Sequence, residues 1–132
     1  MNKQWQELYY AATKVLRPRQ ISSTVEAGGV AAAVESTGGN IYLGVCVDTA
    51  CSLGLCAERN AIFNMLTNGE DAIKRIIAIN SKGKPIPPCG ACRDLMAQLQ
   101  PNDYKSIEIM IDEDKVATLG DLTPEWWTDN FC

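Results

Sequence analysis

Two short motifs carry the side chains best suited to chemistry, Cys56-Ala57-Glu58 and Pro88-Cys89-Gly90-Ala91-Cys92. Together they supply three thiols and one carboxylate. Three thiolates and a water molecule complete the four-coordinate shell of a catalytic zinc ion. A carboxylate beside such a metal can take a proton from the bound water and pass it on. The two motifs therefore supply the groups that a water-activating zinc site with a proton carrier requires, and Glu58 is the candidate carrier.

The ligand cysteines are expected at the starts of two helices. The apolar spacing after Cys56 predicts a helix that ends at Asn68-Gly69, and another helix is expected from about Gly90 to Leu99. Helix starts carry unsatisfied N–H groups and partial positive charge, which favour the deprotonated thiol. Three thiolates leave the zinc cluster with a net negative charge. Arg59 and Arg93 stand beside the motifs and are candidates to withdraw some of it, with a surface salt bridge as the alternative for Arg93.

The number of protein ligands decides between a catalytic and a structural zinc site. The chain has no histidine, so a fourth protein ligand would be a carboxylate or another cysteine: Cys51, Cys46 or Cys132. Cys51 is the main competitor because it lies close to Cys56 in the sequence. Four protein ligands are typical of structural zinc, so a non-catalytic zinc domain stays open as an alternative. A redox Cys-x-x-Cys pair would leave Cys-Ala-Glu unexplained. A disulfide framework is disfavoured because the N-terminus lacks a secretory pattern.

A first cysteine ligand, a glutamate that is not a ligand and a Pro-Cys-x-x-Cys pair form the pattern of zinc-dependent base deaminases. From about Gly29 to about Trp127 the chain resembles the cytidine deaminase family, in the small three-cysteine zinc branch that includes blasticidin S deaminase-like members. The resemblance implies hydrolytic deamination of an aminopyrimidine nucleoside, such as cytidine, deoxycytidine or a close analogue, to the uridine product and ammonia. Another aminopyrimidine, such as blasticidin S, is the alternative within this class.

The resemblance also assigns the central residues of the site. It implies one Zn²⁺ per chain, held by Cys56, Cys89 and Cys92. Glu58 is then the catalytic acid and base, and Arg59 donates hydrogen bonds to the ligand thiolates.

Substrate contacts follow from the same resemblance. Family members bind the ribose hydroxyls through an Asn and a Glu in a segment like Gly-x-Asn-x-Glu, which here is Gly44-Val45-Cys46-Val47-Asp48. Cys46 stands at the Asn position and Asp48 at the Glu position. A thiol is a weaker hydrogen-bonding group than an amide. Ala27 stands where many members have a Phe that stacks on the base, which predicts a wider pocket.

Further contacts concern the backbone and a neighbouring subunit. Backbone groups of Ala57 and Pro87 resemble those that hold the base and the departing ammonia. The segment from Asp121 to Trp127 resembles a C-terminal Leu-Leu-Pro followed by an aromatic residue, which in tetrameric members reaches a neighbour's active site. Trp127 takes that position. The implied assembly is a homo-oligomer, specifically a tetramer.

Composition disfavours several other classes. The chain has 132 residues, 46% of them hydrophobic, which suits one domain over 1–132 and is too short for two. A formal net charge of −4 disfavours nucleic acid as a partner, and with it an RNA- or DNA-editing module, because such proteins need a basic surface. The longest apolar runs are too short to span a bilayer. We therefore expect no membrane partner and a cytoplasmic location.

The remaining pattern predicts the elements that position the site. An amphipathic helix is expected from about Trp5 to Leu16, stopped by Pro18. Strands are predicted at Val30–Val34, Ile41–Val47, Ile76–Ile79, Ile107–Ile111 and Val116–Leu119. Helices between strands predict a layered α/β domain. The family resemblance specifies three layers, with a central mixed five-stranded sheet flanked by helices.

Overall fold

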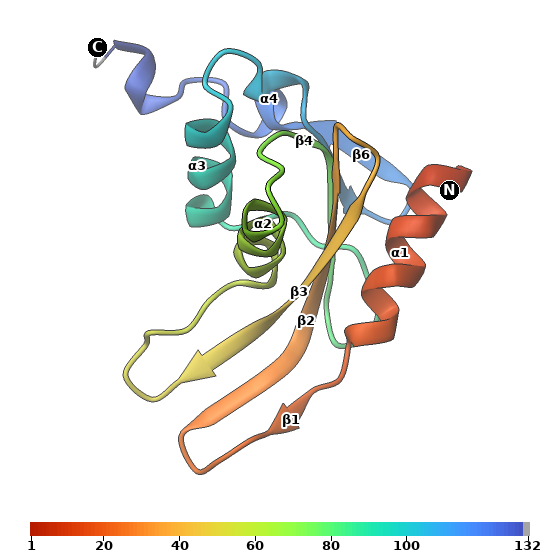
Figure 1. Ribbon diagram of the computed structural model, residues 1–132, viewed down its shortest axis with the longest axis vertical. Helices are drawn as coiled ribbons and strands as arrows, with labels where there is room; N and C mark the ends of the chain where they lie inside the picture. Colours follow the sequence, from red (N-terminus) through yellow and green to blue (C-terminus); the bar gives the residue numbers. More distant parts are fainter. Residues whose placement is uncertain (131–132) are drawn as a thin grey trace.

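In the computed structural model, which describes residues 1–130, a mixed sheet lies between helices on its two faces (Figure 1). The elements in chain order are α1 (Lys3–Val15), β1 (Arg19–Gln20), β2 (Val25–Ser36), β3 (Ile41–Thr49), α2 (Ala57–Thr67), β4 (Ile73–Ile79), α3 (Gly90–Leu99), β5 (Glu108–Asp112), β6 (Lys115–Thr118) and α4 (Leu119–Leu122). Short 3₁₀ turns cover Tyr104–Ser106 and Trp127–Asn130. No helix in residues 1–130 is long and apolar enough to cross a bilayer.

The long strand β2 organises the sheet. It pairs antiparallel with β3 on one edge, and on its other edge first with β1 and then with β4. β4 and β5 are parallel, and β5 and β6 are antiparallel, which makes the sheet mixed as predicted. The sheet has six strands instead of five, because the two-residue strand β1 is too short to leave a periodic pattern. The last predicted strand is wrong at Leu119, which starts α4 behind a capping box formed by Thr118 and Asp121.

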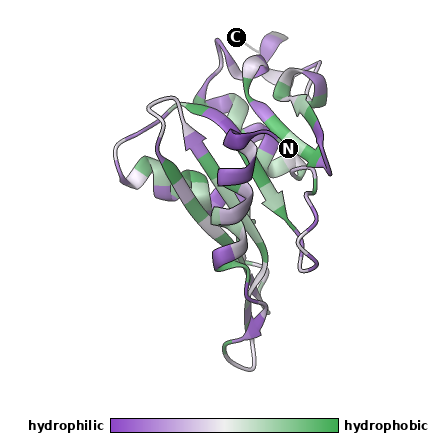
Figure 2. Ribbon diagram, turned by 90° about the vertical axis from the view of Figure 1, so that its right-hand side faces the viewer, coloured by the Kyte–Doolittle hydropathy of each residue, from purple (hydrophilic) through white to green (hydrophobic). Residues whose placement is uncertain are grey.

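Both faces of the sheet are covered, so the central strands are apolar on both sides. Along β2, Ala32 and Val34 join the core under α2 and α3, whereas Ala31 and Ala33 join the core under α1. Figure 2 looks onto the second face, where α1 lies in front of the strands. This two-sided burial explains why β2 and β4 read as continuous apolar runs.

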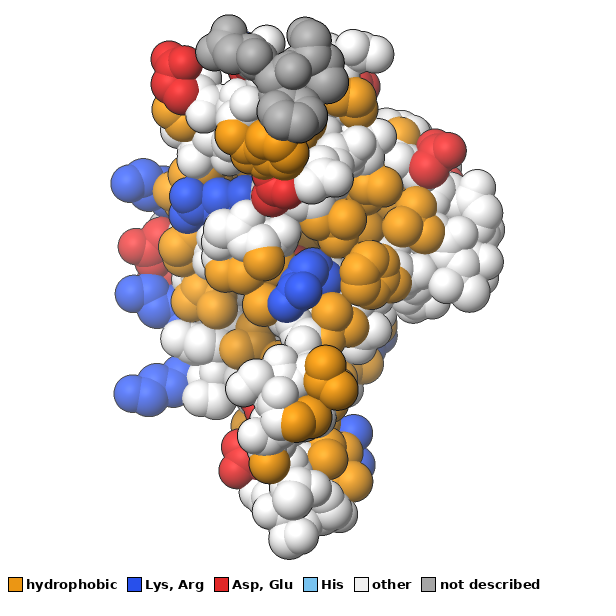
Figure 3. Space-filling view, turned by 90° about the vertical axis from the view of Figure 1, so that its left-hand side faces the viewer, with side chains coloured by type: hydrophobic (Ala, Val, Ile, Leu, Met, Phe, Trp, Pro, Cys, Tyr) orange, Lys and Arg blue, Asp and Glu red, His pale blue; other side chains and the backbone are white. Residues whose placement is uncertain are grey.

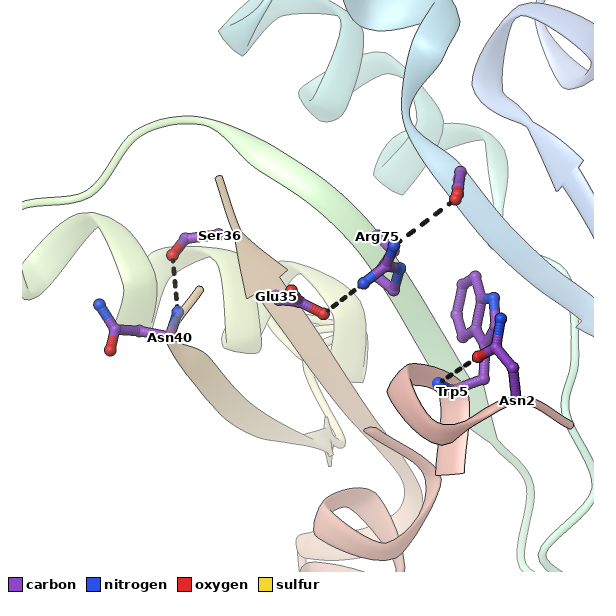
Figure 4. A network of polar contacts seen from close by, with 7 residues as sticks. Asn2, Trp5, Glu35, Ser36, Asn40 and Arg75 are labelled. Atoms are coloured by element: carbon purple, nitrogen blue, oxygen red, sulfur yellow. Dashed lines mark hydrogen bonds and ion pairs between the residues drawn. The ribbon is translucent and has the colours of Figure 1, made fainter. Parts of the chain in front are cut away.

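One buried arginine connects several elements. Arg75 on β4 donates from Nη1 to Glu35 Oε1 of β2 at 2.8 Å, and its Nη2 lies 3.8 Å from Glu108 Oε1 of β5. Its guanidinium lies 5.7 Å from the centre of the Trp5 ring on α1 (Figure 4). The network ties three strands to α1.

Candidate metal centre

Three cysteine sulfurs meet where the N-termini of α2 and α3 converge. Cys56 is the N-cap of α2, Cys89 is the N-cap of α3, and Cys92 lies in the first turn of α3. The Sγ atom of Cys89 lies 3.4 Å from that of Cys56 and 3.4 Å from that of Cys92, and all three lie within 4.8 Å of one another. Sulfurs that share a tetrahedral zinc at about 2.3 Å are about 3.8 Å apart. The three thiols therefore fit a zinc ion.

The lowered thiol pKa expected at the helix starts is found for Cys89, whereas the pKa of Cys92 is raised. Burial opposes ionisation of Cys89, yet hydrogen bonds from the Cys92 backbone N–H and from neighbouring groups hold the pKa of Cys89 below its ordinary value. Cys92 is fully buried, and this burial, together with the Glu58 carboxylate, raises the pKa of the Cys92 thiol. Ligation requires the thiolate, so metal binding at Cys92 must release a proton.

The two arginines beside the motifs have different roles. Arg59 Nη2 lies 3.5 Å from Cys56 Sγ, and this hydrogen bond is the main reason why the pKa of Arg59 is raised. Arg93 does not contact the thiols. Its Nε donates to the Pro88 carbonyl at 2.9 Å and its Nη1 to the Leu122 carbonyl at 3.3 Å. Among residues 1–130 Arg93 forms no ion pair and no bond to the thiols, so neither thiolate support nor a surface salt bridge is found there.

The other cysteines lie outside the three-sulfur cluster. Cys51 is exposed, and its Sγ lies 3.4 Å from Thr49 Oγ1. Cys46 Sγ accepts from the Val30 N–H at 3.2 Å. Cys132, the remaining candidate for a fourth ligand, lies outside the described residues. Within residues 1–130 the cluster has three cysteine ligands and no fourth, which is the donor set of a catalytic zinc site.

A pocket with a volume of about 520 Å³ opens beside the cluster. It is lined by most of the residues that the sequence singled out: Cys46, Asp48, Cys56, Ala57, Glu58, Arg59, Pro87 and Cys89. Glu58 is only 6% exposed, and burial raises the pKa of its carboxyl group. The pocket therefore places a buried carboxyl group beside the ligand thiols.

Two positions that the sequence linked to the substrate, Trp127 and Ala27, do not line this pocket. Trp127 is exposed, and its Nε1 donates to Asp94 Oδ1 at 2.6 Å, outside the pocket of its own chain. A contact with a neighbour's pocket stays a prediction. Ala27 lies within β2 and lines an adjacent hollow that shares Asp48 with the pocket, and the wider pocket expected from the absence of a Phe there stays a prediction.

Sequence reasoning missed part of the pocket wall. Val30 lines the pocket beyond a β-bulge between Ala27 and Ala31. The pair Gly28-Gly29 was the available signal, since glycines inside a strand often mark a bulge. Gly28 has φ +81°, and a Cβ there would lie 2.1 Å from the Arg17 carbonyl oxygen. Thr49, Leu55 and Ile86 also line the pocket, and their sequence context carries no comparable signal.

The fold and the cluster define a zinc-binding α/β domain. A family model described as the cytidine and deoxycytidylate deaminase zinc-binding region matches residues 3–106, and the chain belongs to this family. Zinc is therefore the expected metal, and the three thiols suit it.

Similar proteins agree with this assignment. The chain is 40% identical over 78 residues to a cytidine deaminase from Halalkalibacterium halodurans, and the match covers 58% of each chain. It is 36% identical over 70 residues to a cytidine deaminase from Sporosarcina psychrophila, with 52% of each covered. The chain thus spans little more than half the length of these relatives.

Solved structures share the fold over nearly the whole chain. The cytidine deaminase from Mycobacterium tuberculosis has a TM-score of 0.79 at 23% identity, with 96% of this chain and 98% of that chain covered. The cytidine deaminase from Burkholderia pseudomallei has a TM-score of 0.73 at 28% identity, with 95% and 98% covered. At 23% identity, the similarity to the Mycobacterium tuberculosis protein shows a shared fold and nothing about activity.

Proposed function

We propose that the chain is a zinc-dependent hydrolytic deaminase of an aminopyrimidine nucleoside, with cytidine, deoxycytidine or a close analogue as substrate. The observation that supports this most directly is the position of Glu58, a buried carboxylate in the wall of the pocket that Cys56 and Cys89 also line. The two relatives described above are named cytidine deaminases.

The chemistry needs a nucleophile and a proton carrier. When bound, zinc supplies water with a pKa lowered to about 7. Glu58 would accept one proton from the water and deliver it to the ring nitrogen, and would then take the second proton from the oxygen added to C4 and deliver it to the leaving amine. The water oxygen adds to C4 of the pyrimidine and the bond to the exocyclic nitrogen breaks, giving the uracil product and ammonia. Because burial raises its pKa, Glu58 can hold the proton between these steps.

The charges of the pocket favour a nucleoside over a nucleotide. Apart from thiols, its ionisable groups are Glu58, Asp48 and Arg59. Arg59 is engaged with Cys56, so the two carboxylates oppose a phosphate group. We assign the base and the departing ammonia to backbone groups of Ala57 and Pro87.

The sugar would lie against Cys46 and Asp48. Asp48 is exposed at the pocket wall, where its carboxylate can accept from a hydroxyl group. Cys46 Sγ already accepts from the Val30 N–H, which leaves its weak thiol donor for the sugar.

The proposed assembly is a cytoplasmic homotetramer in which Trp127 reaches a neighbour's pocket. Figure 3 shows the face on the α2 and α3 side, where hydrophobic side chains gather over the middle. Phe63 on α2 is 41% exposed, and Leu53 in the loop before α2 is 83% exposed. Burial of such side chains between subunits would stabilise an assembly.

Ammonia release from zinc-loaded protein tests the proposal. Cytidine and deoxycytidine are expected to react, and deoxycytidylate is expected to react poorly. Glu58→Gln should keep its zinc and lose at least about 100-fold in turnover rate, because the amide cannot carry a proton. Glu113→Gln, at an exposed turn, serves as the matched control. Full activity in zinc-loaded Glu58→Gln would rule out the proton-carrier role, and inertness toward every aminopyrimidine, blasticidin S included, would rule out the deaminase.

A further inference from the structure

Arg93 connects two backbone carbonyls that are far apart in the sequence. Its Nε donates to the Pro88 carbonyl at 2.9 Å, and its Nη1 donates to the Leu122 carbonyl at 3.3 Å. Its neighbour Cys92 is a zinc ligand of the first turn of α3. The planar guanidinium presents its N–H donors in fixed directions, so it holds both carbonyls in one geometry.

The Pro88 side of this bridge is the peptide just before ligand Cys89. Pro87, which lines the pocket, and Pro88 have no backbone N–H, so neither can be held by donating a hydrogen bond. Ile86 still donates to the Ala78 carbonyl. Among the described residues, the one hydrogen bond to Pro87 or Pro88 is the bond that the Pro88 carbonyl accepts from Arg93.

The Leu122 side of the bridge is firmly packed. Leu122 ends α4. A few residues later Trp126 is 7% exposed, and its ring centre lies 5.2 Å from that of Tyr104. Trp126 Nε1 donates to Asp94 Oδ1 at 2.9 Å, so the residue after Arg93 holds the same C-terminal segment.

We propose that Arg93 is a positioning residue of the zinc site. It fixes the Pro87-Pro88 wall and the ligand Cys89 against the packed segment from Leu122 to Trp126. The distance between Cys89 and Cys92 is then set by the C-terminal segment as well as by α3. This role rests on the zinc site and not on the identity of the substrate.

Zinc affinity and a metal spectrum test this role without any measure of deamination. Arg93→Ala is expected to raise the zinc dissociation constant, measured by competition with a chromophoric chelator, about 10- to 100-fold, as for other residues that orient metal ligands. The thiolate-to-metal charge-transfer bands of the Co²⁺-substituted protein should shift as well. Arg93→Lys keeps the charge but has one ammonium group, which cannot reach both carbonyls, so only part of the affinity should return.

Arg75→Lys is the matched control, because it weakens a buried arginine network that joins Glu35, Glu108 and Trp5 and includes none of the three clustered cysteines. It should lower the unfolding temperature and leave the zinc affinity and the Co²⁺ bands unchanged. Three results would overturn the proposal: unchanged affinity in Arg93→Ala, full recovery in Arg93→Lys, or an equal loss in Arg75→Lys. If Arg93→Ala does not fold, the zinc affinities of Arg93→Lys and Arg75→Lys are compared instead. Equal affinities in these two variants would refute the positioning role of Arg93.

Discussion

Gly44 on β3 lies directly against the backbone of α2. A Cβ atom at this position would lie 2.3 Å from the Ala61 nitrogen, 2.7 Å from the Ala57 carbonyl oxygen and 2.8 Å from the Asn60 carbonyl carbon. Ordinary contacts begin at 3.4 Å, so the nearest contact falls 1.1 Å short. All three atoms belong to the backbone of α2, and no rotamer change can relieve them. Gly44→Ala must therefore move the helix by about 1 Å or distort β3.

Such a shift acts on the site because α2 begins with Cys56 and carries Glu58 in its first turn, whereas the other ligands belong to α3. We expect Gly44→Ala to lower the free energy of unfolding by about 1 to 3 kcal/mol, as for other overpacked cores. We also expect turnover of cytidine to fall about 100-fold, the loss typical of a 1 Å misplacement of reacting groups.

The measurements are urea unfolding, zinc per chain and turnover with cytidine. Gly29→Ala is the matched control, since it adds the same methyl group to a neighbouring strand where its nearest contact is Cys46 Sγ at 3.9 Å. It should unfold like the wild type. If Gly44→Ala unfolds, binds zinc and turns over like the wild type, the argument that this glycine sets the position of α2 is refuted.

Three further variants probe the metal site and the scaffold. Cys51→Ser should keep one zinc per chain by metal analysis, because Cys51 lies outside the sulfur cluster. Loss of the metal in this variant would instead support a structural zinc site with Cys51 as its fourth ligand. Arg75→Met should lower the unfolding free energy by about 3 kcal/mol in urea titrations, since it leaves the Glu35 and Glu108 carboxylates unpaired, and an unchanged value would contradict this. Glu70 accepts hydrogen bonds from three side chains of the β2–β3 hairpin, led by Tyr42, which lower its pKa. The Glu70 carboxylate stabilises the fold above its unfolded pKa of about 4.3, and this stabilisation is lost as the pH falls through the lower folded pKa. Between about pH 5 and about pH 3, the unfolding temperature of Glu70→Gln should therefore fall less than that of the wild type.

The elements with strong boundary signals could be predicted from the sequence. α3 runs from Gly90 to Leu99 as predicted, because prolines stand on both sides of it. α2 ends before Asn68-Gly69, also as predicted. The cysteine motifs pointed to one cluster because thiols at two helix starts have few other uses, and the structure brings their sulfurs together.

The features that the sequence did not give depend on contacts between distant segments. The role of Arg93 was predicted from its neighbour Cys92, but its partners are the backbone carbonyls of Pro88 and Leu122. Every residue has such a carbonyl, so no sequence motif can show which ones an arginine binds. Gly44 was read as part of a sugar-binding segment, and its packing under α2 becomes visible only when the helix is in place.

Helix capping shows how far the site departs from ordinary helix chemistry. Away from the cluster, α1 has the conventional cap, since Asn2 Oδ1 accepts from the Trp5 N–H at 3.1 Å, and α4 has a capping box. At the cluster, the N-caps of α2 and α3 are Cys56 and Cys89, which have no side-chain oxygen to cap a helix, and the Cys92 N–H of the first turn of α3 acts on the Cys89 thiol instead. Loss of a good cap costs a helix about 1 kcal/mol. The first-turn N–H groups are in exchange left for the ligand thiolates, whose negative charge they stabilise. At Cys89 such an N–H group lowers the pKa of the thiol, which favours the thiolate form that a metal ligand needs.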